Sequence, residues 1–458
     1  MHCDVRAIHV EEVAAECARQ PERLDLESFS AVPNSCIQIT LSAMLTHIIS
    51  LLMGFVPPPV VATPVAAQKQ DGKQETKQEA KQETIPVIVP DGFKIEIFAK
   101  EPLVADPVAI DIDSQGRIFI AESERQERGV EDNRSSPFWL MEDLTAQTAE
   151  DRLAYYEKYK DKRKGGMDYY TAFADRIRMV EDSNNDDLGD RVTNFSRDFR
   201  EPLDGTGAGI LVDGNDIFYT CIPNLWRLRD ANADGTADST DSMFRGFGVR
   251  TALRGHDMHG LTIGMDGRIY WSIGDRGYHV TTREGVVLAD PKSGAVFRCR
   301  PDGTQLELFA TGLRNPQELA FNEYGDLFTG DNNSDGGDRA RFVYVMPHGE
   351  TGWDMNYQTL EGVNQRGPWN QEGIWHLRSG PDTQYPAWSL PPLAHIGSGP
   401  SGLAYAPGTG MPKEWDRRFY LCDFLGSETQ SSVIAVQVEM DGAGYKVESS
   451  KPFATNVL

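Results

Sequence analysis

Two histidines in the segment RGHDMHG (residues 254–260) are the strongest candidates for acid–base chemistry. His256 and His259 lie on either side of Asp257, directly before an apolar stretch that alternates like a strand. An imidazole is an effective general base near neutral pH, because its unperturbed pKa is close to 6.5. One histidine here would equally suit the capping or packing of a strand. Two histidines beside an aspartate favour a functional site.

The segment GLRNPQELAFNEYGDLFTGDNNSDGGD (312–338) holds a second group of candidates. Arg314 and Asn315 precede a proline that fixes a corner, and a guanidinium offers a planar fork of donors for an anionic or quinoid oxygen. The alternative is a corner arginine paired with an acidic neighbour. The loop that follows, residues 331–338, is rich in the hard oxygen ligands that calcium prefers, although such residues also form ordinary turns.

The stretch DANADGTADSTD (230–241) resembles the calcium loop of an EF-hand. Its matching positions, in order, are held by Asp230, Asn232, Asp234, Gly235, Asp238 and Asp241. The last ligand is the shorter Asp instead of Glu, and no flanking helices are evident. DSNNDDLGD (182–190) is a poorer copy, with Asp187 in place of the turn glycine. We expect both loops at the tips of β-hairpins, where a bound ion would be structural.

The strands that must position these residues are predicted by a repeated sequence pattern. The pattern is an apolar alternating run, a turn, and a second run that contains an aromatic residue. Period-two alternation around a tight turn is typical of a β-hairpin. The five copies are residues 107–123, 207–221, 259–275, 317–331 and 401–423. Their closer spacings suit four-stranded propeller blades. The sequence therefore predicts an all-β protein, a six-bladed-type β-propeller.

A second sequence pattern, an apolar strand followed by a polar corner, precedes the hairpins. It also occurs at residues 93–99 and at the last residues, 451–458. We therefore predict five full blades and an incomplete sixth, to which strand 93–99 contributes. On this interpretation the propeller is truncated at its C-terminus.

Two insertions account for the long spacings between hairpins. Residues 144–166 are charged and predict a helix packed on one face of the blades. Residues 355–392 are rich in Trp, Gly and Pro and predict a long ordered loop over one face.

Composition excludes several classes of function. The 458 residues carry a formal charge of −24, which argues against nucleic acid as a partner. The cysteines do not form the C-x-x-C spacing of a zinc ribbon or an attached haem. Three of them (Cys221, Cys299 and Cys422) lie in the propeller region, and we expect buried free thiols there.

The N-terminal region predicts export. Residues 44–67 combine a short apolar run, a triple proline and small residues, as in a signal peptide, and the run is too short to span a bilayer. Residues 1–43 stay unassigned, and translation from Met44 would explain them. Residues 68–84 are a Gln/Lys/Glu linker with little to bury, and the propeller occupies 85–458. We expect no transmembrane span beyond the signal segment, and a periplasmic or extracellular location.

The segments HDMHGLTIGMDGRIYWSIGDRG and GLRNPQELAFNEYGDLFTGDNNSDGGD resemble the glucose/sorbosone dehydrogenase propellers, whose soluble members use pyrroloquinoline quinone (PQQ) and calcium. The similarity is closest over 254–353. Residues 90–458 resemble a bacterial branch of secreted, dehydrogenase-like propellers. Members of that branch often continue into a c-type cytochrome domain.

The resemblance implies roles for individual residues. Either His256 or His259 would take the proton of the substrate hydroxyl, and Arg314 would stabilise charge as the quinone is reduced. Cofactor contacts would come from Arg314 and Asn315, with Asp257 as a further candidate. Asn333, Ser334 and Asp338 fall where the family holds calcium. Arg339 stands where the family has Glu, and Asn333-Ser334 stands where it has Gly-Pro.

The sequence thus predicts an exported quinone-dependent oxidoreductase that oxidises a sugar or other alcohol and passes electrons to a cytochrome. The alternative is a non-catalytic, calcium-stabilised propeller that binds carbohydrate or a protein partner. A lactonase-like hydrolase is less well supported, because the sequence contains no matching ring of calcium ligands.

Overall fold

The computed structural model describes residues 86–333, 339–356, 390–427 and 429–457. The expected leader, signal peptide and linker lie outside the described residues, as does most of the predicted loop 355–392. In the described part of the chain, no helix is long and apolar enough to cross a membrane.

The described chain is built almost entirely from antiparallel sheets that follow one another in sequence. The first sheet holds β1 (Pro107–Ile112), β2 (Ile118–Ser123), β3 (Asp175–Glu181) and β4 (Arg191–Asn194). The second holds β5 (Gly209–Asp213), β6 (Asp216–Cys221), β7 (Asn224–Arg229) and β8 (Ser239–Arg245). The third holds β9 (Met258–Ile263), β10 (Ile269–Ile273), β13 (Gly294–Cys299) and β14 (Glu307–Leu313), with β18 (Gly349–Glu350) parallel at its edge. The fourth holds β15 (Pro316–Phe321), β16 (Leu327–Asp331), β17 (Arg341–Val345) and β19 (Ala394–His395). The fifth holds β20 (Pro400–Tyr405), β21 (Phe419–Asp423), β22 (Ser432–Asp441) and β23 (Gly444–Thr455), and a separate hairpin pairs β11 (Tyr278–Thr281) with β12 (Val287–Asp290).

All five predicted hairpins are confirmed as the first two strands of the five sheets. Their turns are local in origin. In the first hairpin, the Asp113 side chain accepts hydrogen bonds from the backbone amides of Gln115 and Arg117. Gly116 adopts φ 81° in the same turn, a conformation that favours glycine. Such a tight turn folds the alternating run back on itself.

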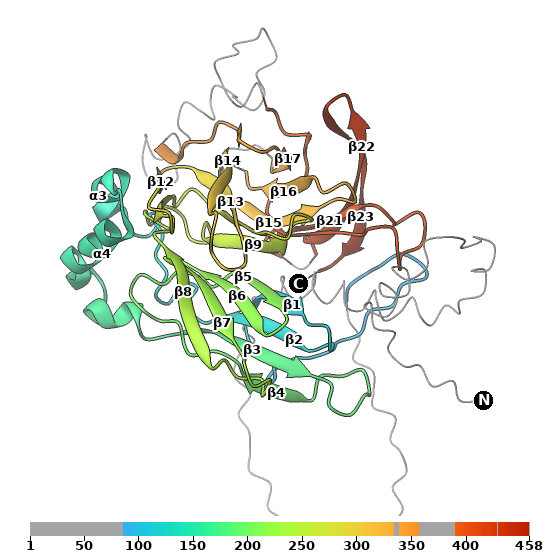
Figure 1. Ribbon diagram of the computed structural model, residues 1–458, viewed down its shortest axis with the longest axis horizontal. Coiled ribbons are helices and arrows are strands. Elements are labelled where there is room, and N and C mark those ends of the chain that lie inside the picture. The colour runs from blue at the N-terminus through green and yellow to red at the C-terminus, as the bar shows by residue number, and fades with distance from the viewer. Residues whose placement is uncertain (1–85, 334–338, 357–389, 428, 458) are drawn as a thin grey trace, which may run out of the picture.

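The first strands of the sheets contact one another in chain order: β1 contacts β5, β5 contacts β9, β9 contacts β15, and β15 contacts β20. The sheets therefore radiate from a common axis, with each outer strand leading to the next inner one, and the fold is an all-β propeller. In Figure 1 the colour runs around this axis from the cyan first sheet to the red fifth sheet. The number of blades in the complete propeller stays a prediction.

The prediction of a strand at 93–99 is wrong, because these residues form no regular strand. Instead, Ile88 exchanges two backbone hydrogen bonds with Thr455 of β23, at 2.9 and 3.0 Å. Phe93 packs against the core of the fifth sheet, and Phe98 packs against the first. No described strand lies alongside 93–99 to form a ladder. Side-chain packing, with a hydrogen bond from the Gly189 amide to the Phe98 carbonyl at 2.8 Å, holds this segment between the last sheet and the first.

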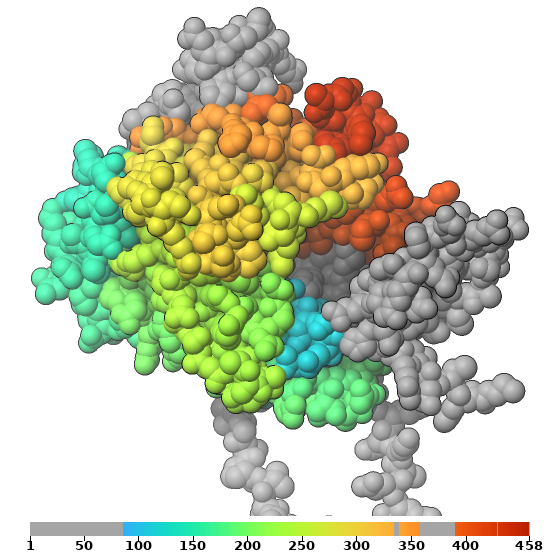
Figure 2. Space-filling view, viewed as in Figure 1, coloured from blue at the N-terminus to red at the C-terminus, as the bar shows by residue number. Residues whose placement is uncertain are grey.

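The predicted helical insertion is confirmed and begins earlier than expected. It contains α3 (Leu140–Thr145) and α4 (Ala149–Lys158), with short 3-10 turns at Pro137–Trp139, Lys160–Lys162 and Gly166–Tyr170. Thr148 and Asp151 form a capping box at the start of α4. An aromatic cluster packs the insertion onto Val249, in the loop that leads to β9. Figure 2 shows the insertion as a teal lobe beside the green and yellow strands.

The three cysteines of the propeller region are buried thiols, as predicted, and form no disulfide among the described residues. Burial raises the pKa of the Cys299 thiol to about 12, so it is not a reactive thiolate at neutral pH. These residues act as small apolar side chains.

Candidate functional site

Four hydrogen bonds hold the loop before β9 in place, two with α3 and two with the loop that precedes the helical insertion. The Thr251 amide donates to Asp143 Oδ1 at 2.6 Å, and Arg250 Nη2 donates to the Leu144 carbonyl at 2.6 Å. The Asn133 amide donates to the Ala252 carbonyl at 3.0 Å, and the Arg254 amide donates to Asp132 Oδ2 at 2.9 Å. The loop that presents His256 is therefore fixed by a segment more than 100 residues earlier.

His256 is oriented by a buried carboxylate. Its Nδ1 lies 2.7 Å from Oδ1 of Asp275, two residues after the end of β10. The other oxygen of Asp275 accepts a hydrogen bond from Trp353 Nε1 at 2.8 Å, and the Asp275 amide donates to the Arg314 carbonyl at 2.8 Å. A neutral His256 whose Nδ1–H donates to this carboxylate has Nε2 as its basic atom. The pair is arranged as an oriented general base.

Close packing at Gly274 brings the histidine and the fourth-sheet corner together. A Cβ atom at this position would lie 2.8 Å from the Cβ of His256 and 2.9 Å from Oδ1 of Asn315. Any side chain here would push these two residues apart.

The Arg314–Asn315 corner is held by Asp331 at the end of β16. The Asp331 carboxylate accepts the backbone N–H of Arg314 at 3.1 Å and that of Asn315 at 2.7 Å, and it pairs with Arg341. Burial, and then the nearby Arg314, lower the pKa of Arg341. The guanidinium of Arg314 lies 5.5 Å from the ring centre of Trp353, within cation–π range. The Asp331 carboxylate thus fixes the backbone of the corner, and Trp353 packs against the guanidinium of Arg314.

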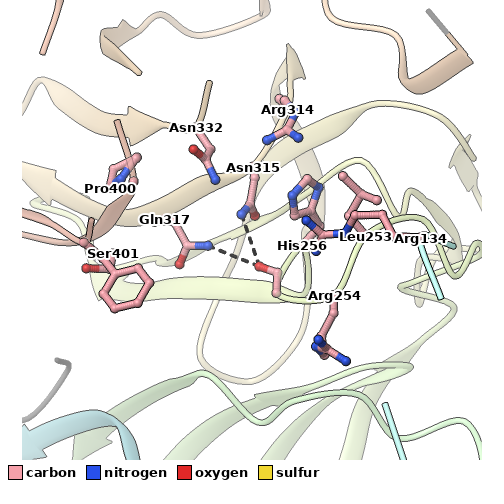
Figure 3. Close-up of a pocket in the computed structure, with 13 residues that line it drawn as sticks. Arg134, Leu253, Arg254, His256, Arg314, Asn315, Gln317, Asn332, Pro400 and Ser401 are labelled. Atoms are coloured by element: carbon pink, nitrogen blue, oxygen red, sulfur yellow. Dashed lines mark hydrogen bonds between the residues drawn. The ribbon is translucent and has the colours of Figure 1, made fainter. Parts of the chain in front are cut away.

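His256, Arg314 and Asn315 line one pocket of about 230 Å³. Figure 3 shows His256 between Arg314 and Arg254, with Asn315 beside them. Asn315 Nδ2 donates to the Gly255 carbonyl at 3.1 Å, and its buried Oδ1 has no hydrogen-bond partner among the described residues. An acceptor left unsatisfied at a pocket wall suits a ligand hydroxyl.

The pocket is strongly polar and carries positive charge. Three arginines are among the thirteen described residues that line it, and none of the thirteen is Asp or Glu. Ser401 and Phe424 come from the fifth sheet side, so three successive blades meet here.

His259 and Asp257 are close in sequence, but the structure does not place them among the residues that line the pocket. His259 lies in β9 with Nε2 3.0 Å from the Gly255 carbonyl, and burial lowers its pKa. Asp257 is fully buried and accepts a hydrogen bond from Arg276 Nη1 at 2.7 Å. Both residues support the strands beneath the pocket.

The two predicted calcium loops form the tips of the hairpins β3–β4 and β7–β8. In the second, Asp230 accepts the backbone N–H of Asp234 and Gly235, and Asp238 accepts that of Ala231. Asn232 Oδ1 also accepts the Asp234 amide. In the first, Asp182 and Asp190 make the corresponding bonds.

Asp241 lies outside the second loop, because it falls within β8 opposite Arg227. At the fourth sheet, the Asn333 amide donates to Asn332 Oδ1, and the other expected ligands, Ser334 and Asp338, lie outside the described residues. Over the described ranges, no three His, Cys, Asp or Glu side chains converge as a metal site. Calcium binding therefore stays a prediction.

The sequence analysis missed Asp275, although a signal for it exists. Three successive hairpins have an aspartate at or just after the end of their second strand. Asp331 and Asp423 are the last residues of β16 and β21, and Asp275 lies two residues after β10. Asp423 accepts the backbone N–H of Ser398 at 2.7 Å, as Asp331 does for its own corner. In the third sheet the equivalent carboxylate holds a histidine side chain instead of a backbone corner.

Comparisons with solved structures found several sugar dehydrogenases similar to this chain. A putative oxidoreductase (glucose dehydrogenase) from Thermus thermophilus has 16% identity and a TM-score of 0.43, covering 76% of this chain and 84% of its own. The PQQ-bound aldose sugar dehydrogenase from Streptomyces coelicolor has 16% identity and a TM-score of 0.43, with coverage of 80% and 84%. The PQQ domain of pyranose dehydrogenase from Coprinopsis cinerea has 12% identity and a TM-score of 0.46, with coverage of 82% and 88%.

The search of curated proteins found no match to the chain. One family model matches residues 79–452, which include all five sheets except the last residues of β23. The chain therefore belongs to the family described as a domain of unknown function, DUF7133.

Proposed function

We propose that the protein is an oxidoreductase that oxidises a hydroxyl group of a sugar or other alcohol, with His256 as the base. The observation that carries this proposal is the His256–Asp275 pair in a pocket shared with Arg314 and Asn315. Oxidation of an alcohol needs a group that removes the hydroxyl proton, and an oriented imidazole is suited to this role.

The proton would pass from the substrate hydroxyl to Nε2 of His256. Asp275 would stabilise the imidazolium that forms, because its carboxylate lies 2.7 Å from Nδ1. Trp353 donates to the same carboxylate and restrains its rotation. Asn315 Oδ1 would orient the substrate by accepting a hydrogen bond from a neighbouring hydroxyl.

The quinone that the sequence resemblance implies suits the donors of this pocket. Arg314 and the amides of Asn315, Gln317 and Asn332 line it, and guanidinium and amide N–H groups bind the carbonyl and carboxylate oxygens that PQQ carries. When bound, the quinone would supply the oxidant, because it can take up the hydrogen of the alcohol carbon together with two electrons, as a hydride. Arg314 would hold and polarise an oxygen of the cofactor. We assign no step to calcium, because Asn333 is the one expected ligand there that the structure describes.

The test is reconstitution of the full-length protein with PQQ and calcium, followed by dye reduction across a panel of sugars and alcohols. We expect substrate-dependent reduction that requires PQQ. Quinone that binds without reduction on any substrate of a broad panel would contradict the proposal and favour a carbohydrate- or protein-binding propeller.

We further propose that the protein is exported to the periplasm or beyond, on the strength of the signal-like residues 44–67. Fractionation of the native host, with mass spectrometry of the mature N-terminus, tests this. A chain that retains residues 44–67 in the cytoplasmic fraction would contradict it.

A further inference from the structure

The pocket has the opposite charge to the protein as a whole. The chain has 69 acidic and 45 basic residues, yet the described residues that line the pocket include Arg134, Arg254 and Arg314 and no carboxylate. An acidic surface repels an anionic ligand at long range, and the arginines of the pocket are the local groups that can attract one. The arginines of the pocket therefore indicate a ligand that carries negative charge.

The three arginines differ in depth. Arg314 is 1% exposed and lies against Trp353, whereas the side chains of Arg254 and Arg134 are 19% and 43% exposed. Arg314 is thus an inner residue, and the other two form the rim of the pocket. Figure 3 shows His256 between the inner arginine and Arg254.

The rim arginines are positioned by the loop that precedes the helical insertion. Asp132 accepts hydrogen bonds from Nε and Nη2 of Arg134 and from the Arg254 backbone, so a single buried carboxylate ties both residues together. Burial raises the pKa of Asp132, but these donors outweigh burial and lower it below its usual value. Asn133, which is buried, bonds to Ala252 and receives Trp139 Nε1. Asn133 thus links the loop before the insertion both to Trp139 and to the loop before β9.

The ion pair that Arg254 makes is weak enough to be exchanged for a ligand. Arg254 Nη2 lies 2.6 Å from Oε1 of Glu127, whose side chain is 73% exposed. Exposed ion pairs contribute little, because water and salt compete for both partners. An anionic group that enters the pocket can therefore replace Glu127 on Arg254.

We propose that Arg254 and Arg134 bind an anionic substituent of the substrate, so that the preferred substrate is an acidic sugar that carries a carboxylate or a sulfate ester. This inference rests on the proposed function, since it assumes that the reacting hydroxyl lies at His256. The guanidinium groups bind two anionic oxygens at once, and this fixes the sugar ring with one hydroxyl toward the histidine.

Calorimetric titration of the full-length protein tests the inference without requiring turnover. The probes are D-glucuronate, D-glucose 6-sulfate and neutral D-glucose. We expect at least one acidic sugar to bind about tenfold more tightly than glucose, with the preference reduced by 0.5 M NaCl. R254Q should lose the preference. R245Q, which breaks the comparable exposed pair between Arg245 and Glu150, should retain it. Equal affinity for neutral and acidic sugars would overturn the inference, as would an unchanged preference in R254Q.

Further measurements identify which anionic group binds, and they test the anion site and the proposed oxidation independently of each other. Glucuronate and the sulfate ester distinguish carboxylate from sulfate. Titration with PQQ should give the same affinity for R254Q as for the unaltered protein, and a matching loss would assign the arginines to the cofactor and overturn the inference. Preferred binding of an acidic sugar without dye reduction would contradict the proposed oxidation and leave the anion site supported. Dye reduction at equal efficiency with glucose and glucuronate would contradict the anion site and leave the proposed oxidation supported.

Discussion

His256 Nδ1 and Asp275 Oδ1 lie 2.7 Å apart at the open end of one hairpin, where the segment before β9 meets the segment after β10. The carboxylate holds the imidazole in the tautomer that leaves Nε2 basic, and it stabilises the protonated ring. This relationship gives His256 and His259 different expected roles.

Replacement of Asp275 by Asn should lower kcat by about 10²–10⁴-fold while the protein stays folded. The amide can donate to Nδ1, which would favour the wrong tautomer. The pH profile should also change, because imidazolium loses its partner. D216N is the control, since Asp216 of β6 pairs with two arginines of β7, away from the pocket. Steady-state kinetics from pH 5 to 9 checks this, and an unchanged kcat and profile in D275N would contradict it.

Replacement of His256 by Gln should abolish most turnover, with a loss of at least about 10²-fold. H259Q should retain turnover and show a lower melting temperature. His259 contacts the Gly255 carbonyl within the buried strand, and glutamine can replace that contact only in part. Parallel dye-reduction assays and thermal melts separate the two residues. The reverse pattern, with H259Q inactive and H256Q active, would move the base to His259.

Local features of the sequence predicted the five hairpins and the Arg314–Asn315 corner. Alternation, turn residues and Pro316 act over a few positions, so these elements follow directly from the sequence. The alternation also suggested a strand at 93–99, where no described strand is available as a partner. Pairing depends on a neighbour that periodicity does not reveal.

The partners of the candidate site were harder to predict, because they depend on how distant segments meet. Asp132 reaches the Arg254 backbone across more than 100 residues, and nothing in the charged insertion indicates that contact. Asp275 reaches His256 through the β9–β10 register. Only the recurrence of aspartate at Asp331 and Asp423 hinted that this position holds a corner.

The buried pair of Asp257 and Arg276 should contribute strongly to stability. Both side chains are fully buried and 2.7 Å apart, so D257N leaves the Arg276 charge without its carboxylate. We expect the free energy of unfolding to fall by about 3–5 kcal/mol. R245Q, in an exposed pair, should cost less than about 1 kcal/mol. Guanidinium unfolding measures both, and a loss in D257N no larger than in R245Q would contradict this assignment.

Calcium should raise the melting temperature if the two hairpin-tip loops bind it. An ion present at about 100-fold its dissociation constant adds about 2.7 kcal/mol of stability. D230N removes the carboxylate that accepts two amides in the second loop, and D182N does the same in the first. Each variant should reduce the shift, and both together should abolish it. Melting with calcium against chelator is the measurement, and a shift that survives in the double variant would place the ion elsewhere.

Glu318 should make the protein less stable as the pH rises toward 8. It lies on β15, where Oε1 accepts the Gly260 amide at 3.0 Å. Burial, with added repulsion from Asp111, raises the pKa of Glu318 to about 8 despite the hydrogen bond from Gly260. The folded state therefore holds a proton that the unfolded state has released above pH 4 to 5.

The sign of the effect follows from that difference. Because the folded pKa lies above the unfolded one, the unfavourable contribution of Glu318 is absent below about pH 4, grows as the pH rises, and is complete above about pH 8. E318Q keeps an oxygen acceptor for the Gly260 amide and cannot ionise. We expect E318Q to match the unaltered protein near pH 5 and to melt several degrees higher at pH 8.5. E323Q, a change at a partly buried glutamate that pairs with Arg417, is the control for loss of one charge. Parallel pH dependence in E318Q and the unaltered protein would show that Glu318 is ionised in the folded state at neutral pH.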